Sequence, residues 1–562
     1  MFSINVARKS FSLDGLWGYR TDENREGLDK GWANGFEPEQ KVVVPSCLVL
    51  DGKMSYRGLA WFETEFEAEG LIEFKFDGVQ TSADIWVDGQ KLGSHYGGWS
   101  EFRFYKQLAP GKHVLVLAVD NTPNMQNTIP LLRVDWYHYG GISRSVVLSR
   151  VGQAFVKRAK LDYDLDLATG VATITPKVAL LSDGKADGFV KVEMDGKVIA
   201  EGTVAADGEY HALPTVDVPV KLWDTDEPNL YNVVVSTVDD ALFFRTGFRK
   251  IEARERAIYL NGNKVYFKAI NRHDEHPDWG FSMPFGLIKR DLDLIKGMGM
   301  NAVRGAHYAH NKCVLDYCDE IGLLFWEEIP MWTYTEKHLQ DDFVLTRAET
   351  MLEEMILRDE AHPCIVFWGV HNEVETEKPG ARTATERLVK KVRSLDSSRL
   401  VTYASNRLFM EDTDPDICHD LVDVICCNTY PCWYTTEKTK KDTYDLDEWK
   451  VTLDEIFDDR DRNYPDMPVI ISEFGAGGIY GVKEHEAVKW TEEYQELYFA
   501  NTLPLLLNDE RLSGFFIWQF ADIRSCEDMI LSRPRGFNNK GLFNENRKPK
   551  LAYYKVKEIL GK

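Results

Sequence analysis

Residues 365–373 read Ile-Val-Phe-Trp-Gly-Val-His-Asn-Glu, an apolar run that ends in polar side chains. Residues 468–474, Pro-Val-Ile-Ile-Ser-Glu-Phe, repeat this pattern further along the chain. Unbroken apolar runs of this length are typical of strands that are buried on both faces of a parallel sheet. Both runs therefore predict core strands, and each places a glutamate, Glu373 or Glu473, at the carboxyl end of its strand.

Further strand-like runs surround these two between Ala253 and the C-terminus. Together the eight runs are residues 266–271, 301–308, 323–328, 365–373, 400–405, 422–430, 468–474 and 514–522. Helical segments fall between them, such as residues 291–298, 347–360, 383–395 and 487–507. Regular alternation of strand and helix indicates parallel pairing, and eight such units predict a (β/α)8 TIM barrel over residues 253–562.

The N-terminal part of the chain has short alternating runs that are broken by Gly, Asp and Asn. Examples are residues 59–67, 72–76, 83–87 and 113–119. Asp88-Gly89 stands between two of these runs and is a strong signal for a hairpin turn. This pattern predicts a sugar-binding-like β-sandwich of the jelly-roll type over residues 1–152.

A second group of strand-like runs follows, separated by Asp-Gly turns at positions 183, 195 and 207. The clearest runs are residues 171–178, 189–194 and 230–235. A segment of this length with several short strands predicts a smaller, immunoglobulin-like β-sandwich over residues 153–252.

Composition limits the partners and the location. The 562-residue chain has a formal net charge of −23 at pH 7. A field of that sign repels phosphate, which argues against a nucleic acid or an anionic membrane as a partner. Residues 1–13 have no apolar run of signal-peptide length, no apolar run is long enough to span a membrane, and several of the nine cysteines lie in apolar runs. We therefore expect a cytoplasmic protein with reduced thiols.

Cys426, Cys427 and Cys432 lie close together in the sequence and were considered as metal ligands. Adjacent residues of a strand point to opposite faces, and no Cys-x-x-Cys pair follows them. We expect no metal site and no organic cofactor.

Polar side chains gather at the carboxyl ends of the predicted barrel strands, which is where TIM barrels build their active sites. Among them are His273, Arg304 and Trp518, which we expect to contact a substrate. Glu373 and Glu473 emerge from buried strands, and two facing carboxyl groups have pKa values pushed apart. That arrangement predicts a retaining glycosidase with the carboxyl groups about 5–5.5 Å apart. The alternative is a structural pair neutralised by Arg304 or by lysines.

Two long motifs resemble the signatures of glycoside hydrolase family 2. The first begins with Asn-Ala-Val-Arg-Gly-Ala-His-Tyr at residues 301–308 and runs through residues 316–322 to Trp-Glu-Glu at residues 326–328. The second is His-Pro-Cys-Ile-Val-Phe-Trp-Gly-Val-His-Asn-Glu at residues 362–373. The similarity spans nearly the whole chain, and the order of two sandwiches and a barrel is also that of the family. It implies an exo-glycosidase that forms homo-oligomers.

The resemblance also implies roles for single residues. Glu373 would be the acid/base and Glu473, in Ser-Glu-Phe-Gly, the nucleophile. Asn372 would bind the 2-hydroxyl of the sugar, and Tyr430 would donate a hydrogen bond to the nucleophile.

The C-terminal stretch Gly-Phe-Asn-Asn-Lys-Gly-Leu-Phe at residues 536–543 resembles the Asn-x-Lys element of β-glucuronidases, including those of gut bacteria. It implies that Asn538 and Lys540 bind the C6 carboxylate of a glucuronide. A carboxylate that enters a pocket loses hydration, which a cation and a donor offset. Tyr434 matches a second carboxylate contact of those enzymes, and Asp135 matches an aspartate that approaches the sugar hydroxyls.

Two departures leave alternatives open. Residues 326–332, Trp-Glu-Glu-Ile-Pro-Met-Trp, are closer to β-galactosidase-like relatives, and the loop between Trp332 and Val344 is short. A β-galacturonidase is the nearest rival, because it shares the carboxylate contact and differs in one hydroxyl orientation. A β-galactosidase-like enzyme and a catalytically silent carbohydrate-binding protein are further alternatives. The roles of Arg533 and Arg535 stay open.

Overall fold

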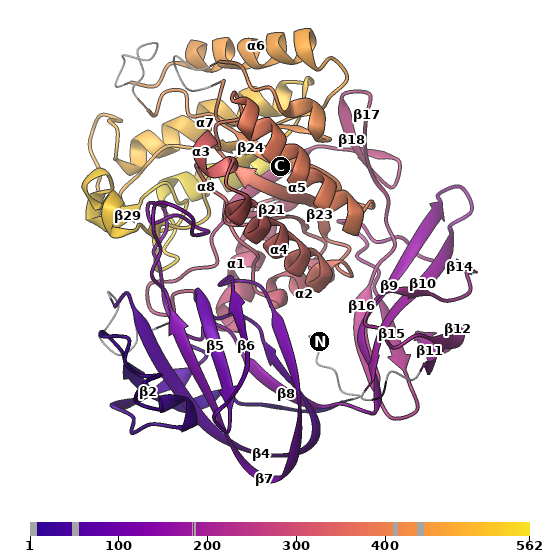
Figure 1. Ribbon diagram of the computed structural model, residues 1–562. Helices are drawn as coiled ribbons and strands as arrows, with labels where there is room; N and C mark the ends of the chain where they lie inside the picture. The colour runs from indigo at the N-terminus through magenta and orange to yellow at the C-terminus, as the bar shows by residue number, and fades with distance from the viewer. Residues whose placement is uncertain are drawn as a thin grey trace.

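The structure is a computed structural model of the chain, and it describes residues 8–47, 56–182, 184, 187–408, 414–434 and 443–561. Figure 1 shows three parts in chain order: a β-sandwich in indigo and purple, a smaller one in magenta, and a barrel wrapped by orange and yellow helices. The predicted fold class is therefore confirmed.

The N-terminal sandwich is an eight-stranded sheet with the order β1-β8-β4-β7-β5-β6, to which β2 and β3 add at β4. Its strands are β1 (Lys9–Ser12), β2 (Gly15–Thr21), β3 (Gln40–Val44), β4 (Leu59–Phe76), β5 (Ser82–Val87), β6 (Gln90–Tyr96), β7 (Phe102–Asp120) and β8 (Val146–Arg150). Asp88 and Gly89 form the predicted turn, with φ of 51° and 73°. The two runs predicted at 59–67 and 72–76 are one strand, because a bulge at Ala68/Gly70 lets β4 continue.

The second sandwich consists of two four-stranded antiparallel sheets. Its strands are β9 (Ala154–Asp166), β10 (Val171–Ser182), β11 (Gly188–Met194), β12 (Lys197–Val204), β13 (His211–Ala212), β14 (Val216–Pro219), β15 (Tyr231–Ser236) and β16 (Ala241–Thr246). The turn predicted at Asp183 lies outside the described residues. Three short strands lead on to the barrel: β17 (Ile251–Arg254), β18 (Ala257–Leu260) and β19 (Asn263–Val265).

Eight parallel strands form a closed barrel. They are β20 (Phe267–Arg272), β21 (Ala302–Gly305), β22 (Leu324–Glu328), β23 (Ile365–Asn372), β24 (Leu400–Ser405), β25 (Ile425–Asn428), β26 (Val469–Phe474) and β27 (Leu512–Ile517). The longer helices around them are α1 (Phe285–Gly297), α2 (Lys312–Ile321), α4 (Asp342–Asp359), α5 (Pro379–Leu395), α6 (Leu446–Asn463), α7 (Glu492–Asn508) and α8 (Leu551–Leu560). The short predicted loop after the third strand holds only α3 (Glu336–Leu339).

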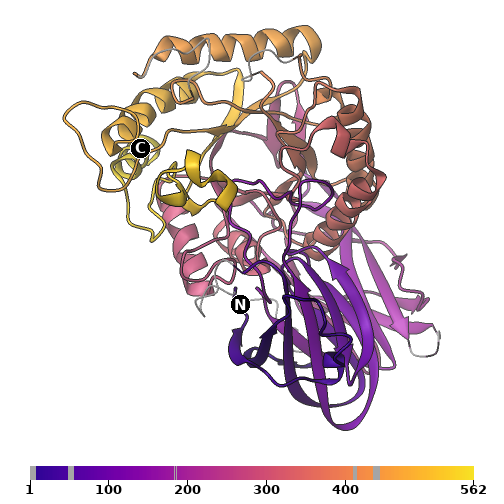
Figure 2. The ribbon, with the colours of Figure 1, turned by 60° about the vertical axis from the view of Figure 1, so that its left-hand side comes forward.

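The eighth strand ends earlier than predicted, at Ile517, because the chain then leaves the barrel. β28 (Ile523–Arg524) pairs instead with β29 (Phe537–Asn538) in a two-stranded antiparallel sheet. This pairing brings the C-terminal segment to the mouth of the barrel. Figure 2 shows a purple loop of the N-terminal sandwich reaching toward the same end of the barrel.

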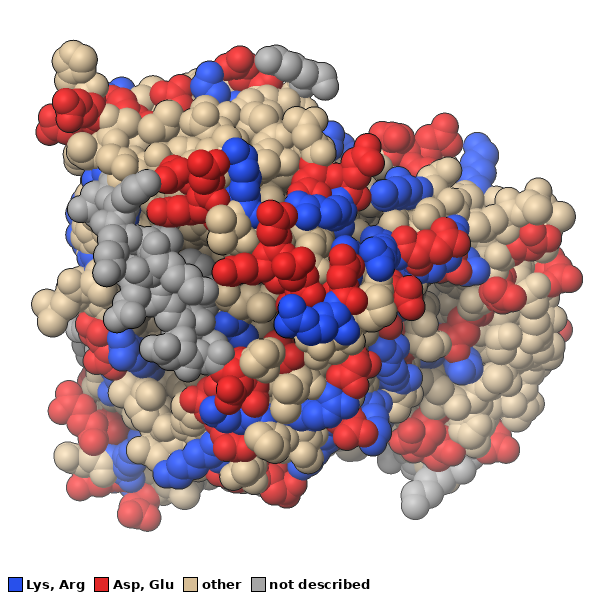
Figure 3. Space-filling view, turned by 90° about the horizontal axis from the view of Figure 1, so that it is seen from above, with Lys and Arg blue, Asp and Glu red and all other residues tan. Residues whose placement is uncertain are grey.

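The surface carries both signs of charge. Figure 3 shows acidic and basic side chains interspersed over one face of the molecule. Within the described part of the chain, no helix is both long and apolar enough to cross a membrane.

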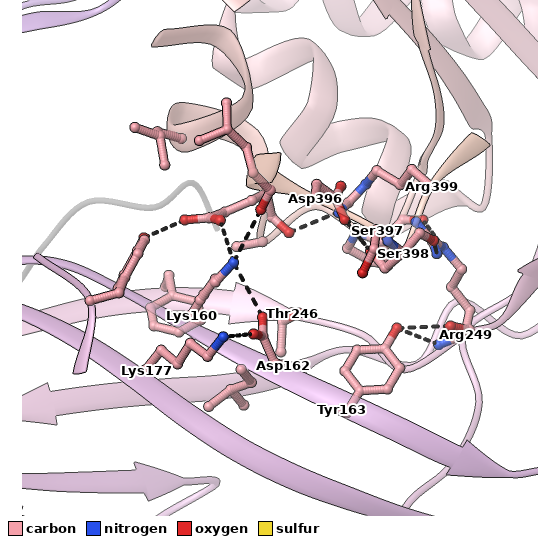
Figure 4. A pocket seen from close by; sticks show the side chains of 18 of the residues that line it. Lys160, Asp162, Tyr163, Lys177, Thr246, Arg249, Asp396, Ser397, Ser398 and Arg399 are labelled. Atoms are coloured by element: carbon pink, nitrogen blue, oxygen red, sulfur yellow. Dashed lines mark hydrogen bonds and ion pairs between the residues drawn. The ribbon is translucent and has the colours of Figure 1, made fainter. Parts of the chain in front are cut away.

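The second sandwich contacts the end of the barrel at which the strands begin. This is opposite the end reached by the loop of the N-terminal sandwich and by the C-terminal segment. Arg249, 2 % exposed, donates to the carbonyl groups of Pro363, Ile365 and Ser398, which lie where strands β23 and β24 begin. Figure 4 shows the pocket between the two parts, lined by charged side chains such as Lys160.

Candidate active site

Glu473 lies at the carboxyl end of β26 and is 4 % exposed. One carboxylate oxygen accepts a hydrogen bond from Arg304 Nη1 at 2.8 Å, and the other accepts from the Tyr430 hydroxyl at 2.7 Å. Donors on both oxygens stabilise the charged carboxylate and fix its orientation. The contact predicted between Tyr430 and Glu473 is present.

Arg304, on β21, has no exposed surface. Besides Glu473, its guanidinium binds both oxygens of Glu328, at 2.9 and 3.0 Å, and Asn372 Oδ1 at 2.7 Å. These N–H groups point to protein acceptors. The predicted contact of Arg304 with the substrate stays a prediction, and these bonds favour another role, in which Arg304 positions Glu473.

Glu373 follows the last residue of β23 and has a φ of 53°, a left-handed conformation that costs a non-glycine residue about 1–3 kcal/mol. Its carboxylate accepts from Asn428 Nδ2 at 2.9 Å. Burial, and then the charge of Glu473, raise the pKa of Glu373 to about 7, while the bond from Asn428 acts in the opposite direction. Glu373 is therefore protonated in acidic solution and in about half of the molecules near pH 7, as a general acid requires.

One chain of hydrogen bonds joins the two carboxyl groups. Asn372 Oδ1 accepts from Arg304, which binds Glu473, and from Asn428 Nδ2 at 3.2 Å, which binds Glu373. Asn372 Nδ2 has no hydrogen-bond partner among the described residues, although the residue is only 1 % exposed. A buried amide without an acceptor is available to a ligand hydroxyl. The predicted contact of Asn372 with a sugar stays a prediction, and this free donor supports it.

Aromatic rings surround the predicted sugar contacts His273 and Trp518. His307 stacks on Trp518 with ring centroids 5.1 Å apart, and His273 meets Trp518 edge-on at 5.5 Å. Trp136, from the N-terminal sandwich, lies 5.8 Å from His273. Burial lowers the pKa of His273 well below its usual value, so its ring is neutral, and Nε2 has no partner in the described part of the chain. Such a ring offers one more polar group to a sugar.

Lys540 is 3 % exposed, and its ammonium donates to the Tyr434 hydroxyl at 2.8 Å. The rings of Tyr434, Tyr430 and Trp433 surround the ammonium, with centroids 4.9, 5.5 and 5.7 Å away. Within the described residues, no carboxylate lies within 4.0 Å of this nitrogen. A buried ammonium is costly without a counter-ion, so this one favours an anionic ligand group. Tyr430 contacts both this cation and Glu473, so one side chain links the ammonium to the candidate nucleophile.

Asp135 reaches this region from the N-terminal sandwich. Its carboxylate pairs with Arg533 at 2.7 and 2.9 Å and accepts from Asn538 Nδ2 at 2.7 Å and from Ser525 at 3.3 Å. Arg533 is the largest of the nearby charges that lower the pKa of Asp135, against the effect of burial. Asp135 is therefore ionised and ties the sandwich to the segment that carries Asn538 and Lys540.

Sequence reasoning missed several contributors. Asn428 ends β25 and lies inside the run predicted at residues 422–430, so its position in that run was the one signal for it, and Ser472 fixes its amide by donating to Oδ1 at 2.7 Å. Trp136 stands beside Asp135 in the sequence, yet nothing local marks it as part of the barrel mouth. The ion pair of Arg533 with Asp135 joins residues nearly 400 positions apart in the chain.

Cys426 and Cys432, two of the three cysteines that lie close together in the sequence, contact different groups. Thr402 donates to Cys426 at 3.2 Å, and the Cys432 thiol lies 3.1 Å from the carbonyl of Asp445. Asp316, Asp319 and His362 form another group with metal-ligand atoms, but His362 is bonded to Asp319 at 2.6 Å and Arg245 lies 3.6 Å from Asp316. A nearby guanidinium disfavours a cation there.

Comparison with known families decides the classification. The family model described as "Glycosyl hydrolases family 2, TIM barrel domain" matches residues 251–562, and the one described as "Glycosyl hydrolases family 2" matches residues 154–249. The chain belongs to glycosyl hydrolase family 2. It is a glycoside hydrolase, in agreement with the resemblance seen in its motifs.

Curated family 2 relatives include β-glucuronidases. The enzyme of Rattus norvegicus is 26 % identical over 97 % of this chain and 90 % of its own, and that of Paenibacillus borealis is 26 % identical over 97 % and 96 %. Among solved structures, a family 2 β-galacturonidase from Eisenbergiella tayi bound to galacturonate matches with a TM-score of 0.91 and 32 % identity, covering 100 % of this chain and 98 % of its own. A β-glucuronidase from Ruminococcus gnavus in complex with D-glucaro 1,5-lactone matches with 0.87 and 25 %, covering 100 % and 99 %.

Proposed function

We propose that this family 2 hydrolase releases D-glucuronate from β-D-glucuronides as a retaining exo-glycosidase. The observation that carries the proposal is the buried ammonium of Lys540, which has no carboxylate partner among the described residues and lies beside Tyr430, the tyrosine that binds Glu473. A sugar whose C6 carboxylate bonds Lys540 would sit against Glu473. The names of the curated relatives support the same substrate class.

The first step uses the protonation difference between the two glutamates. Glu473 attacks C1 as a carboxylate while Glu373 gives its proton to the glycosidic oxygen, so the bond to the aglycone breaks and a glycosyl ester forms. In the second step water attacks C1 and gives a proton to the ionised Glu373, and the ester bond breaks. Glucuronate leaves, and both glutamates return to their starting forms. Neither step requires a metal ion or an organic cofactor.

A β-galacturonide is the second candidate substrate. The galacturonidase from Eisenbergiella tayi is 32 % identical, against 25 % for the glucuronidase from Ruminococcus gnavus. Both substrates carry the carboxylate that Lys540 would bind, and they differ in the orientation of the hydroxyl at C4. A panel of aryl β-glucuronide, β-galacturonide, β-glucoside and β-galactoside separates these candidates and the β-galactosidase-like alternative.

Lys540→Ala tests the carboxylate contact. Because breaking a buried charge pair costs about 3–5 kcal/mol, kcat/KM for the aryl β-glucuronide is expected to fall by about 100-fold or more. Activity on the aryl β-glucoside is expected to be unchanged or higher. Lys548→Ala, an exposed lysine in the same segment, is the matched control. An equal loss on both substrates would refute the contact with the uronic acid.

Two further points stay predictions. The homo-oligomer implied by the family is checked by light scattering after size-exclusion chromatography, and the cytoplasmic location by fractionation.

A further inference from the structure

Lys550 is a lysine with no exposed surface, at the residue before helix α8. Its ammonium donates to Asp522 Oδ1 at 2.7 Å and to the backbone carbonyl of Asn539 at 3.1 Å. Asn539 stands between Asn538 and Lys540, the two residues that we call the carboxylate clamp. Lys550 therefore holds the peptide group that directly precedes Lys540.

Asp522 holds the peptide group on the other side of Lys540. It also has no exposed surface, and its Oδ1 accepts from the backbone N–H of Gly541 at 2.9 Å. The fit is close, because a Cβ on Gly541 would lie 2.3 Å from the backbone nitrogen of Asp522. One buried ion pair thus fixes the backbone immediately before and after the clamp lysine.

Two more contacts limit the movement of this segment. The N–H of Gln519 donates to the carbonyl of Lys540 at 3.1 Å, and Gln495 Nε2 donates to the same carbonyl at 3.2 Å. Gln519 lies just after β27 and Gln495 lies in helix α7, whereas Lys550 precedes helix α8, so three separate parts of the chain hold this segment. The Lys540 ammonium, in contrast, bonds a side chain, the Tyr434 hydroxyl.

We propose that Lys550 and Asp522 are a positioning pair for the uronic-acid subsite: they fix the backbone of residues 539–541 so that the Lys540 ammonium meets the substrate carboxylate. This inference rests on the proposed function, and it extends that function to residues that do not touch the substrate. The pair would set the selectivity for uronides over neutral sugars, since displacing a binding group by about 1 Å costs up to about 100-fold in rate.

The test uses a double variant, Asp522→Asn with Lys550→Met. Removing only Lys550 would leave a buried carboxyl group without its cation, whereas removing both charges with isosteric side chains is often tolerated. Lys160→Met is the matched control. Its ammonium lies 3.3 Å from Asp162 and from Glu360 in the pocket at the opposite end of the barrel, which Figure 4 shows.

The measured quantity is the ratio of kcat/KM for the aryl β-glucuronide to that for the aryl β-glucoside, with KM and kcat for each substrate. We expect the double variant to lower this ratio by about tenfold or more, mainly through a higher KM for the glucuronide. Lys160→Met should leave the ratio unchanged. If the pair had only a structural role, the double variant would lose activity on both substrates equally and keep the wild-type ratio. An unchanged ratio in a folded double variant would therefore overturn the inference.

The wild type and Lys540→Ala, assayed in parallel, separate this failure from a failure of the proposed function. If the wild type does not prefer the glucuronide or the galacturonide, or if Lys540→Ala keeps the preference, the proposed function fails and the inference falls with it. If both behave as expected while the double variant keeps the wild-type ratio, the inference alone is refuted.

Discussion

Asn428→Ala is expected to move the basic limb of the pH profile of kcat/KM to higher pH. Glu373 must be protonated in the free enzyme in order to act as the acid, and its pKa is raised to about 7 by burial and by the charge of Glu473. The fraction of active enzyme therefore falls as the pH rises through about 7. Asn428 donates at 2.9 Å to Glu373 Oε1 and so favours the charged form.

The sign and size of the shift follow from this bond. Without the Asn428 donor the charged form of Glu373 is less stable, so its pKa rises. A hydrogen bond to a charged group is worth about 1.5–3 kcal/mol, and one pKa unit corresponds to about 1.4 kcal/mol. Glu373 is partly exposed, so water replaces some of the lost bond. We therefore expect the limb to move up by about 0.5–1 pH unit.

The assay is kcat/KM for an aryl β-glucuronide, measured across the pH range at low substrate concentration, since this parameter reports the free enzyme. Asn301→Ala is the control, because its amide bonds only backbone groups of Lys268 and Tyr266 at the amino ends of the strands. It should leave the basic limb in place. A basic limb that stays where it is in Asn428→Ala, or moves to lower pH, would show that Glu373 is not the titrating acid or that Asn428 does not act on it.

Two other predictions concern Glu473, the proposed nucleophile. Glu473→Ala should abolish turnover of the aryl β-glucuronide while circular dichroism shows a folded protein, and near-normal activity would eliminate its role. Arg304→Lys should lower kcat by about 100-fold, because a single ammonium cannot reproduce the bidentate contact with Glu328 together with the bonds to Asn372 and Glu473. A folded variant with wild-type kcat would contradict the positioning role.

The barrel could be predicted because its strands are buried on both faces. The runs at residues 365–373 and 468–474 are continuous in apolar side chains, and the structure has β23 and β26 there, with no exposed residue in either. The strand ends were harder to predict. The eighth run is predicted to extend to residue 522, yet β27 ends at Ile517, and residues 523–524 pair with residues 537–538, which lie too far along the chain for a local pattern to reveal.

The same distinction explains which parts of the site could be predicted. Glu373 and Glu473 are visible because each ends a core strand, so local sequence alone places them at the barrel mouth. Asp135, Arg533 and Lys550 act through contacts with distant segments, and a local pattern contains no information about such partners.

Arg304 illustrates the limit most clearly. A cation at the end of a barrel strand can bind either the substrate or the carboxylates of the active site. The sequence alone does not show which of these two partners it binds. The deciding fact is burial: a guanidinium with no exposed surface and acceptors on Glu328, Asn372 and Glu473 has no donor to offer a ligand. Lys540 differs in its partners. Its ammonium is surrounded by the rings of Tyr430, Trp433 and Tyr434 and bonds the Tyr434 hydroxyl, but it pairs with no carboxylate among the described residues. Of these two buried cations, Lys540, which forms no ion pair with a carboxylate among the described residues, is therefore the one that we propose selects the substrate.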